Sequence, residues 1–174
     1  MRLLVLILLF YLTLLSTKGV SKGVSLDKLF KASFSSTVTV GQKIITLNAK
    51  EVQSLQKRAK AKMDSNKIRF YVVKDASKVV GYGVLVVQRV RTKKAAILYL
   101  VSKDNKIKSI EIIQFQEPSE YKPNQAWKDV FTGKVKEDNL FAGKGIPTIS
   151  GATMSARAIS DASRIALSIV EIYK

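Results

Sequence analysis

The amino-acid sequence predicts an α+β fold in which helices pack on a single antiparallel β-sheet. Between residues 68 and 116, segments rich in Val, Ile, Tyr and Phe follow one another, as expected of β-strands. The links between them are short, and parallel neighbours would need a long crossover, so adjacent strands must run antiparallel. After Thr153 the apolar residues recur with helical spacing up to Tyr173, which predicts a long amphipathic helix that packs along its length.

The predicted strands span residues 68–74, 78–90, 94–101 and 106–116, with a shorter one at residues 43–47. Before them, Leu26, Leu29 and Phe30 indicate a short helix. Asn48 is a good N-cap for a helix from Ala49 to about Met63.

The composition removes several kinds of chemistry. The chain of 174 residues has 47% hydrophobic and 25% charged residues, as in a folded domain, and it contains neither cysteine nor histidine. Disulfides, Cys or His metal sites, and catalysis by Ser-His-Asp or Cys-His groups are therefore excluded. No pair of carboxylates is placed for hydrolysis, so we assign no catalytic residue and expect an organic cofactor or no chemistry.

The first residues have the pattern of an export signal. Met1 and Arg2 precede an apolar run from Leu3 to Leu15, which is shorter than the roughly 20 residues that span a bilayer. We interpret residues 1–21 as a signal peptide or an uncleaved anchor, and residues 22–174 as the mature domain. Both interpretations predict a domain outside the cytoplasm, in the periplasm or on the outer face of the inner membrane.

The net charge of +17 first raises a nucleic-acid hypothesis. However, the basic residues are scattered, no aromatic-rich basic motif accompanies them, and an exported protein rarely meets nucleic acid. We therefore expect no nucleic-acid partner. The alternatives are attraction to an anionic membrane surface, attraction to an acidic redox partner, or simply a basic soluble surface.

The residues before the C-terminal helix could bind an anion. Gly151 and Ala152 leave room for a ligand near the backbone, and the hydroxyl of Thr153 lies near the positive end of the helix dipole. Arg157 follows one turn later on the same face. This arrangement suits a phosphate. The alternative is an ordinary helix cap in which Ser150 or Thr148 accepts the backbone N–H bonds.

The sequence Ser150-Gly151-Ala152-Thr153 resembles the signature of the FMN-binding domain family. This family includes flavin-carrying components of the sodium-translocating NADH:quinone reductase and of the Rnf complex, together with secreted relatives. The resemblance implies that Thr153 carries FMN through a phosphoester attached by a periplasmic flavin transferase. It also implies that Ser150, Gly151, Ala152 and Ser155 contact the cofactor.

Other segments, in the expected order, extend the resemblance over residues 68–167. Gly81-Tyr82-Gly83 is similar to an early family strand with a glycine pair, where either a flavin ring or a packed helix would fit. Glu117-Pro118-Ser119-Glu120-Tyr121 and the aromatic helix from Trp127 resemble later elements. The resemblance implies that Glu117, Pro118, Tyr121 and Trp127 lie near the flavin ring.

One position departs from the family pattern. The transferase usually recognises an Asp three residues before the motif Ser, and this chain has Pro147 there. FMN binding without the covalent bond therefore stays open as an alternative.

The resemblance implies an exported electron-transfer flavoprotein that exchanges electrons with a redox partner protein or a membrane electron-transfer complex. The rival hypotheses are a cofactor-free binding or scaffold domain of the same fold, and a basic protein that binds membrane surfaces or polyanions.

Overall fold

The computed structural model describes residues 25–174, so the predicted leader lies outside the described residues. The centre of this part of the protein is a five-stranded antiparallel sheet. Its strands lie side by side in the same order as they occur in the sequence. The strands are β1 (Thr39–Thr46), β2 (Lys67–Asp75), β3 (Lys78–Arg89), β4 (Lys94–Ser102) and β5 (Ile107–Phe115). The predicted α+β class is confirmed.

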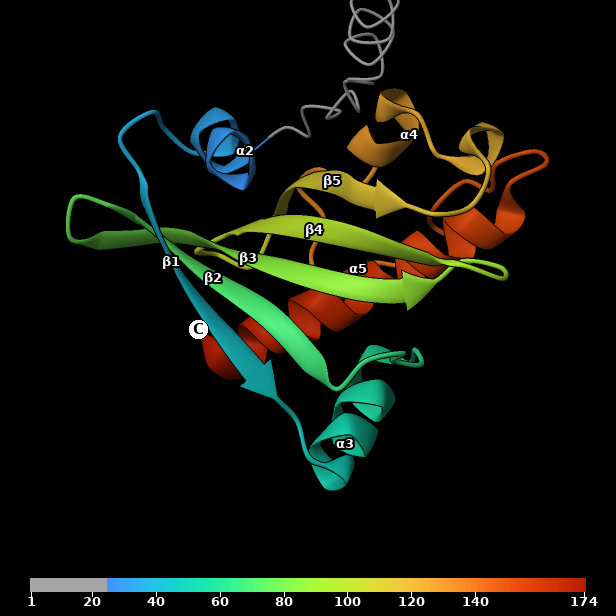
Figure 1. Cartoon of the computed structure of the whole chain (residues 1–174), viewed down its shortest axis with the longest axis horizontal. Helices are drawn as coiled ribbons and strands as arrows, with labels where there is room; N and C mark the ends of the chain where they lie inside the picture. The colour runs from blue at the N-terminus through green and yellow to red at the C-terminus, as the bar shows by residue number, and fades with distance from the viewer. Residues whose placement is uncertain (1–24) are drawn as a thin grey trace, which may run out of the picture.

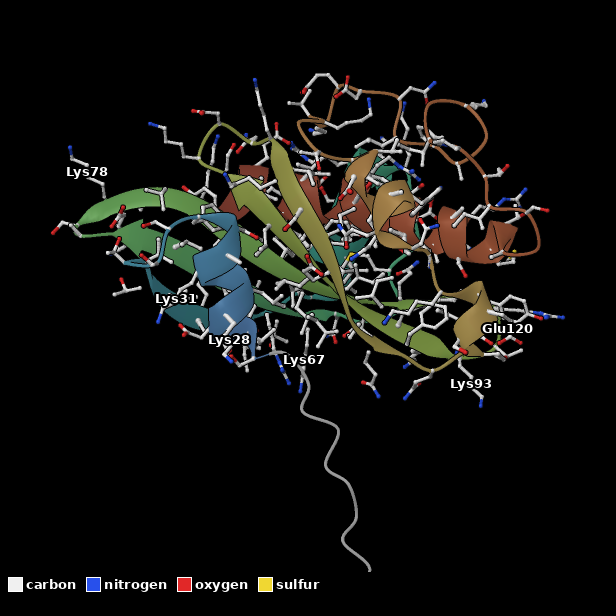
Figure 2. All side chains as sticks on the ribbon, turned by 90° about the horizontal axis from the view of Figure 1, so that it is seen from above. Lys28, Lys31, Lys67, Lys78, Lys93 and Glu120 are labelled. Carbon is white, nitrogen blue, oxygen red and sulfur yellow. The ribbon has the colours of Figure 1, made fainter. Side chains whose placement is uncertain are left out.

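The helices lie on both sides of this sheet (Figure 1). They are α2 (Leu26–Ser33), α3 (Ala49–Ala59), α4 (Gln125–Asp129) and α5 (Thr153–Tyr173), with a 3₁₀ turn, η1 (Ser119–Tyr121), after β5. The α5 helix crosses one face of the sheet, whereas α2 covers the other. Lysines of α2 and of the start of β3, such as Lys28, Lys31 and Lys78, point outward from the molecule (Figure 2). Within residues 25–174, no helix combines the length and the apolar character needed to cross a membrane.

The main core forms between α5 and the sheet. Ile159, Ile165 and Ile169 of α5 are fully buried, as is Tyr99 of β4. The Tyr99 hydroxyl donates a hydrogen bond of 2.7 Å to the Ile159 carbonyl, and burial raises the pKa of Tyr99 well above 10.0, so the phenol stays protonated. This bond fixes the position of α5, and with it the helix start, on the sheet.

The glycine pair of β3 is where α2 packs. An added Cβ on Gly81 would lie 2.3 Å from Cε1 of Phe34, and one on Gly83 would lie 2.6 Å from Cζ of Phe30. Only a residue without a side chain allows this close approach. A helix occupies the gap, so the alternative that a flavin ring lies there is wrong.

Two predicted boundaries needed correction. Asn48 caps α3 with Glu51 in a capping box, as expected, but the helix ends at Ala59 and not near Met63. It ends there because the Arg164 side chain, buried on α5, donates hydrogen bonds to the carbonyls of Ala59 and Lys60. The strand predicted at residues 43–47 begins earlier, at Thr39, which faces Lys74 of β2.

Candidate functional site

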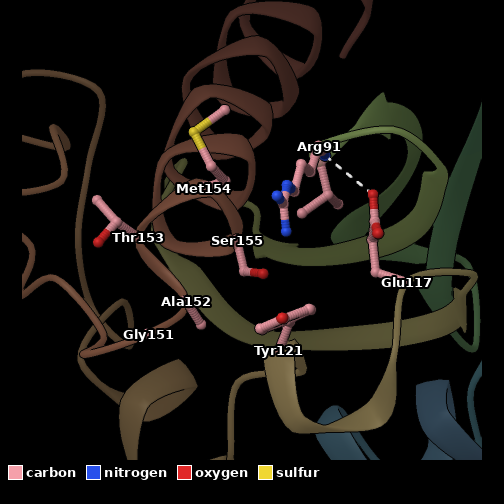
Figure 3. Close-up of a pocket in the computed structure, with 9 residues that line it drawn as sticks. Arg91, Glu117, Tyr121, Gly151, Ala152, Thr153, Met154 and Ser155 are labelled. Carbon is pink, nitrogen blue, oxygen red and sulfur yellow. Dashed lines mark hydrogen bonds between the residues drawn. The ribbon is translucent and has the colours of Figure 1, made fainter.

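The start of α5, the end of β3 and the segment after β5 enclose a cavity of about 230 Å³ (Figure 3). These three segments are far apart in the sequence and meet because α5 packs across the sheet. The residues that line the cavity are Val90, Arg91, Glu117, Tyr121, Gly151, Ala152, Thr153, Met154 and Ser155.

The helix start at this cavity is not capped by a side chain. Ala152 occupies the N-cap position without a capping bond, so the alternative that Ser150 or Thr148 caps the helix is wrong. Among residues 25–174, the backbone N–H groups of Thr153, Met154 and Ser155 have no hydrogen-bond acceptor. Uncapped N–H groups at the positive end of a 21-residue helix are typical of a binding site for an anion.

Gly151 shapes the backbone just before this start. Its φ of +73° lies in the left-handed region that glycine adopts most easily. An added Cβ would meet no atom within 4 Å, so the space beside Gly151 is open. The glycine thus turns the chain into the helix and leaves access to its first N–H groups.

Ser155 contributes a buried hydroxyl to the cavity. The side chain is 1% exposed, and its Oγ has no hydrogen-bond partner among the described residues. Figure 3 shows Ser155 on the side of the helix that faces Arg91 and Tyr121, whereas Thr153 points away from Arg91. Because a buried hydroxyl without a partner is costly, this atom indicates a place for a polar ligand atom.

Glu117 holds the β3–β4 turn against the segment after β5. Its Oε1 accepts hydrogen bonds from the backbone N–H groups of Lys93 at 2.7 Å, Thr92 at 2.6 Å and Arg91 at 3.2 Å. The bond from Lys93, with those from Thr92 and Arg91, outweighs desolvation and lowers the pKa of Glu117 below 4.5. Glu117 is therefore a charged anchor that positions Arg91 at the cavity.

The structure brings together only part of the residues expected near the cofactor. Those that line the cavity are Glu117, Tyr121, Gly151, Ala152, Thr153 and Ser155. Ser150, Pro118, Trp127 and Arg157 are not among the lining residues.

Trp127 and Arg157 have other positions. Trp127 is buried against Phe131, and its Nε1 donates a hydrogen bond of 2.9 Å to the Pro147 carbonyl, so it supports the loop before the helix. The side chain of Arg157 is exposed. Its position on the helix does not bring it into the cavity lining, unlike that of Ser155.

Sequence reasoning missed three lining residues, Val90, Arg91 and Met154. Arg91 lies in a turn whose sequence indicates only a short link between strands. Met154 directly follows the motif Thr and is 46% exposed, which is unusual for a large apolar side chain. The position of Met154, an apolar residue directly after the motif, was the sequence feature that could have identified it as a lining residue.

The comparison with protein families agrees with this geometry. The model of the FMN-binding domain family matches residues 93–168, a range that holds β4, β5, Glu117 and most of α5. No curated protein matches the chain. An open helix start with an unpartnered buried hydroxyl fits a phosphorylated cofactor, and the match of residues 93–168 to the FMN-binding domain family indicates FMN as that cofactor.

Proposed function

We propose that this flavin-binding protein is an exported electron carrier that holds FMN covalently through Thr153. The observation that carries the proposal is the uncapped start of α5, where Thr153 stands beside N–H groups without acceptors and near the unpartnered hydroxyl of Ser155. When bound, FMN supplies the electron transfer, while the protein supplies position and electrostatics.

The Thr153 hydroxyl is available for a phosphoester. It is half-buried at the cavity edge, and its hydrogen bond to the Ile149 carbonyl is long, at 3.5 Å. A phosphate monoester does not condense with an alcohol unaided in water, so a flavin transferase must supply FMN as an anhydride. With FAD as the donor, Thr153 Oγ forms the bond to phosphorus and loses its proton, and AMP leaves.

The cavity supports a cofactor that stays partly exposed. Its volume of about 230 Å³ is below the roughly 300–1,000 Å³ that is common for small-molecule sites. Part of FMN would therefore extend beyond the cavity, where a partner could exchange electrons with it. A covalent bond suits an exported protein because a dissociated cofactor would be lost outside the cell.

The test is the intact mass of protein purified from an exporting host that has a flavin transferase. The wild-type chain and a Thr148→Ala control should be heavier by one FMN minus water and remain yellow after denaturation. Thr153→Ala should have an unmodified mass, because only the Thr153 hydroxyl forms the bond.

Two other outcomes would change the proposal. A yellow wild-type protein that loses its colour on denaturation would mean that FMN binds without the bond, consistent with Pro147 in the recognition pattern. A flavin-loaded chain that transfers no electron to any acceptor after reduction would contradict the carrier role.

A further inference from the structure

A second hollow, distinct from the cavity, borders the proposed flavin site. This groove, of about 790 Å³, lies between the end of α3, the end of β3 and the start of α5. It shares Val90, Arg91 and Met154 with the cavity, so the two hollows are adjacent. A molecule in the groove would be next to whatever the cavity holds.

The groove is strongly basic. Its cationic side chains are Lys57, Lys60, Lys62, Arg89 and Arg91. All of them are exposed, and within residues 25–174 none of these cations forms an ion pair. Their charge is thus available to an anionic partner.

The acidic side chains of the groove already have partners. Asp64 accepts a hydrogen bond from the Arg89 backbone N–H, and Asp161 forms an ion pair with the buried Arg164. Asp161 is thus paired with a cation outside the groove lining, which leaves Asp64 as one carboxylate beside five cationic side chains. The groove therefore keeps a large excess of positive charge.

FMN does not account for this charge. It carries a single phosphate, and Thr153 points away from Arg91 in Figure 3. A phosphate bound at Thr153 would leave the lysines of α3 unused. Excess cations that line a concave surface instead favour a protruding acidic surface.

The border between the two hollows has the features of a transient protein interface. Met154 is 46% exposed there, and exposed methionines adapt to varied partner surfaces. Such an apolar centre within a charged rim is common in protein interfaces, and electron-transfer complexes are typically small and weak. Gln88 adds a buried side chain whose Oε1 has no partner among residues 25–174 and could accept an N–H bond.

We propose that this groove is the docking surface for a redox partner protein with an acidic surface, which reaches the flavin beside Met154. The inference rests on the proposed function. A bilayer is less suitable as the occupant, because a flat membrane cannot enter a concave groove, whereas a protein protrusion can.

The test measures binding of a fluorescent polyglutamate peptide as a probe for an acidic surface. The groove variant is Lys57→Glu with Lys62→Glu. The matched control is Lys28→Glu with Lys78→Glu, which has the same net charge but lies toward the end of the molecule opposite Lys93 and Glu120 (Figure 2). At about 10 mM ionic strength, the groove variant should bind the peptide about tenfold more weakly than the control.

The outcomes separate this inference from the proposed function. Peptide binding is measured on protein with and without flavin, so the groove and control variants can still be compared if flavin loading fails. Equal weakening in both variants would overturn the groove as the docking site. Loss of binding to phosphatidylglycerol vesicles in the groove variant, with peptide binding retained, would overturn it in favour of a membrane surface.

Discussion

At the scale of single residues, the hydroxyl of Ser155 links stability to ligand binding. Its Oγ is buried without a partner in the described part of the protein, so the folded state without ligand carries an unmet desolvation cost. We predict that Ser155→Ala raises the free energy of unfolding of flavin-free protein by about 1–3 kcal/mol. In a Thr153→Ala background the same change should weaken reversible FMN binding about tenfold.

Chemical denaturation and flavin fluorescence titration measure these two effects. A loss of stability in the flavin-free Ser155→Ala protein would contradict the view that this hydroxyl awaits a ligand. A residue that only supports the fold would not combine a gain in stability of the flavin-free protein with a loss of FMN affinity, whereas a ligand-binding residue would.

Glu117 is a second single residue with a testable charge. Its folded pKa is lower than its ordinary value of 4.5, so its stabilisation is fully present above about pH 4.5. It is lost as the pH falls through the lowered folded value, because protonation weakens the bonds from Lys93, Thr92 and Arg91. We predict that the thermal midpoint of wild-type protein falls more steeply below pH 4.5 than that of Glu117→Gln. Parallel curves for the two proteins would contradict this assignment.

At the scale of elements, the contact between α2 and β3 depends on a missing side chain. A Cβ on Gly81 would lie 2.3 Å from Phe34 and 2.5 Å from the Val101 carbonyl oxygen, and backbone atoms cannot easily move. We predict that Gly81→Ala lowers the free energy of unfolding by about 1–3 kcal/mol. Gly41→Ala is the control, since its Cβ would approach the Val72 oxygen only to 4.0 Å.

The Gly81→Ala substitution also tests whether the contact between α2 and the sheet is independent of the cavity at the start of α5. Because α2 and the cavity lie at different parts of the sheet, Gly81→Ala should keep its full flavin content while it unfolds at lower denaturant concentration. Loss of flavin from the folded Gly81→Ala protein would show that the two regions are coupled.

The elements were predictable where local patterns decide them. The strand segments from residue 67 to residue 115 were predicted within a residue or so, because their apolar patterns and short turns leave few alternatives. The end of α3 was not predictable, because Arg164, more than a hundred residues later, supplies the hydrogen bonds that end it.

The candidate site also contains residues that a local pattern predicts and residues that only a tertiary contact brings there. Thr153 and its neighbours form a continuous motif and could be identified from the sequence. Arg91 reaches the cavity only because Glu117 binds the turn that holds it, a tertiary contact that no local pattern reveals.

At the scale of the whole molecule, the charge balance sets a further expectation. The chain has 30 Lys and Arg against 13 Asp and Glu, and a net charge of +17 works against a compact state through self-repulsion. Salt shortens the range of this repulsion, with a Debye length of about 30 Å at 0.01 M and about 10 Å at 0.1 M. We therefore predict that sodium chloride, raised over this range, increases the thermal midpoint of the mature, flavin-free Thr153→Ala protein by a few degrees.

The ion pairs of the described residues act in the opposite direction but are too weak to reverse this effect. Most involve partly exposed side chains, such as Arg58 with Glu171, and exposed pairs contribute about 0–1 kcal/mol each. The groove variant, made in the same Thr153→Ala background, has a net charge lower by four because two cations become two anions, and it should show a smaller salt effect than the Thr153→Ala protein. The control variant with Lys28 and Lys78 reversed should show the same reduction, because self-repulsion depends on total charge and not on the groove. A thermal midpoint that falls with salt in all three proteins would mean that local ion pairs outweigh net repulsion.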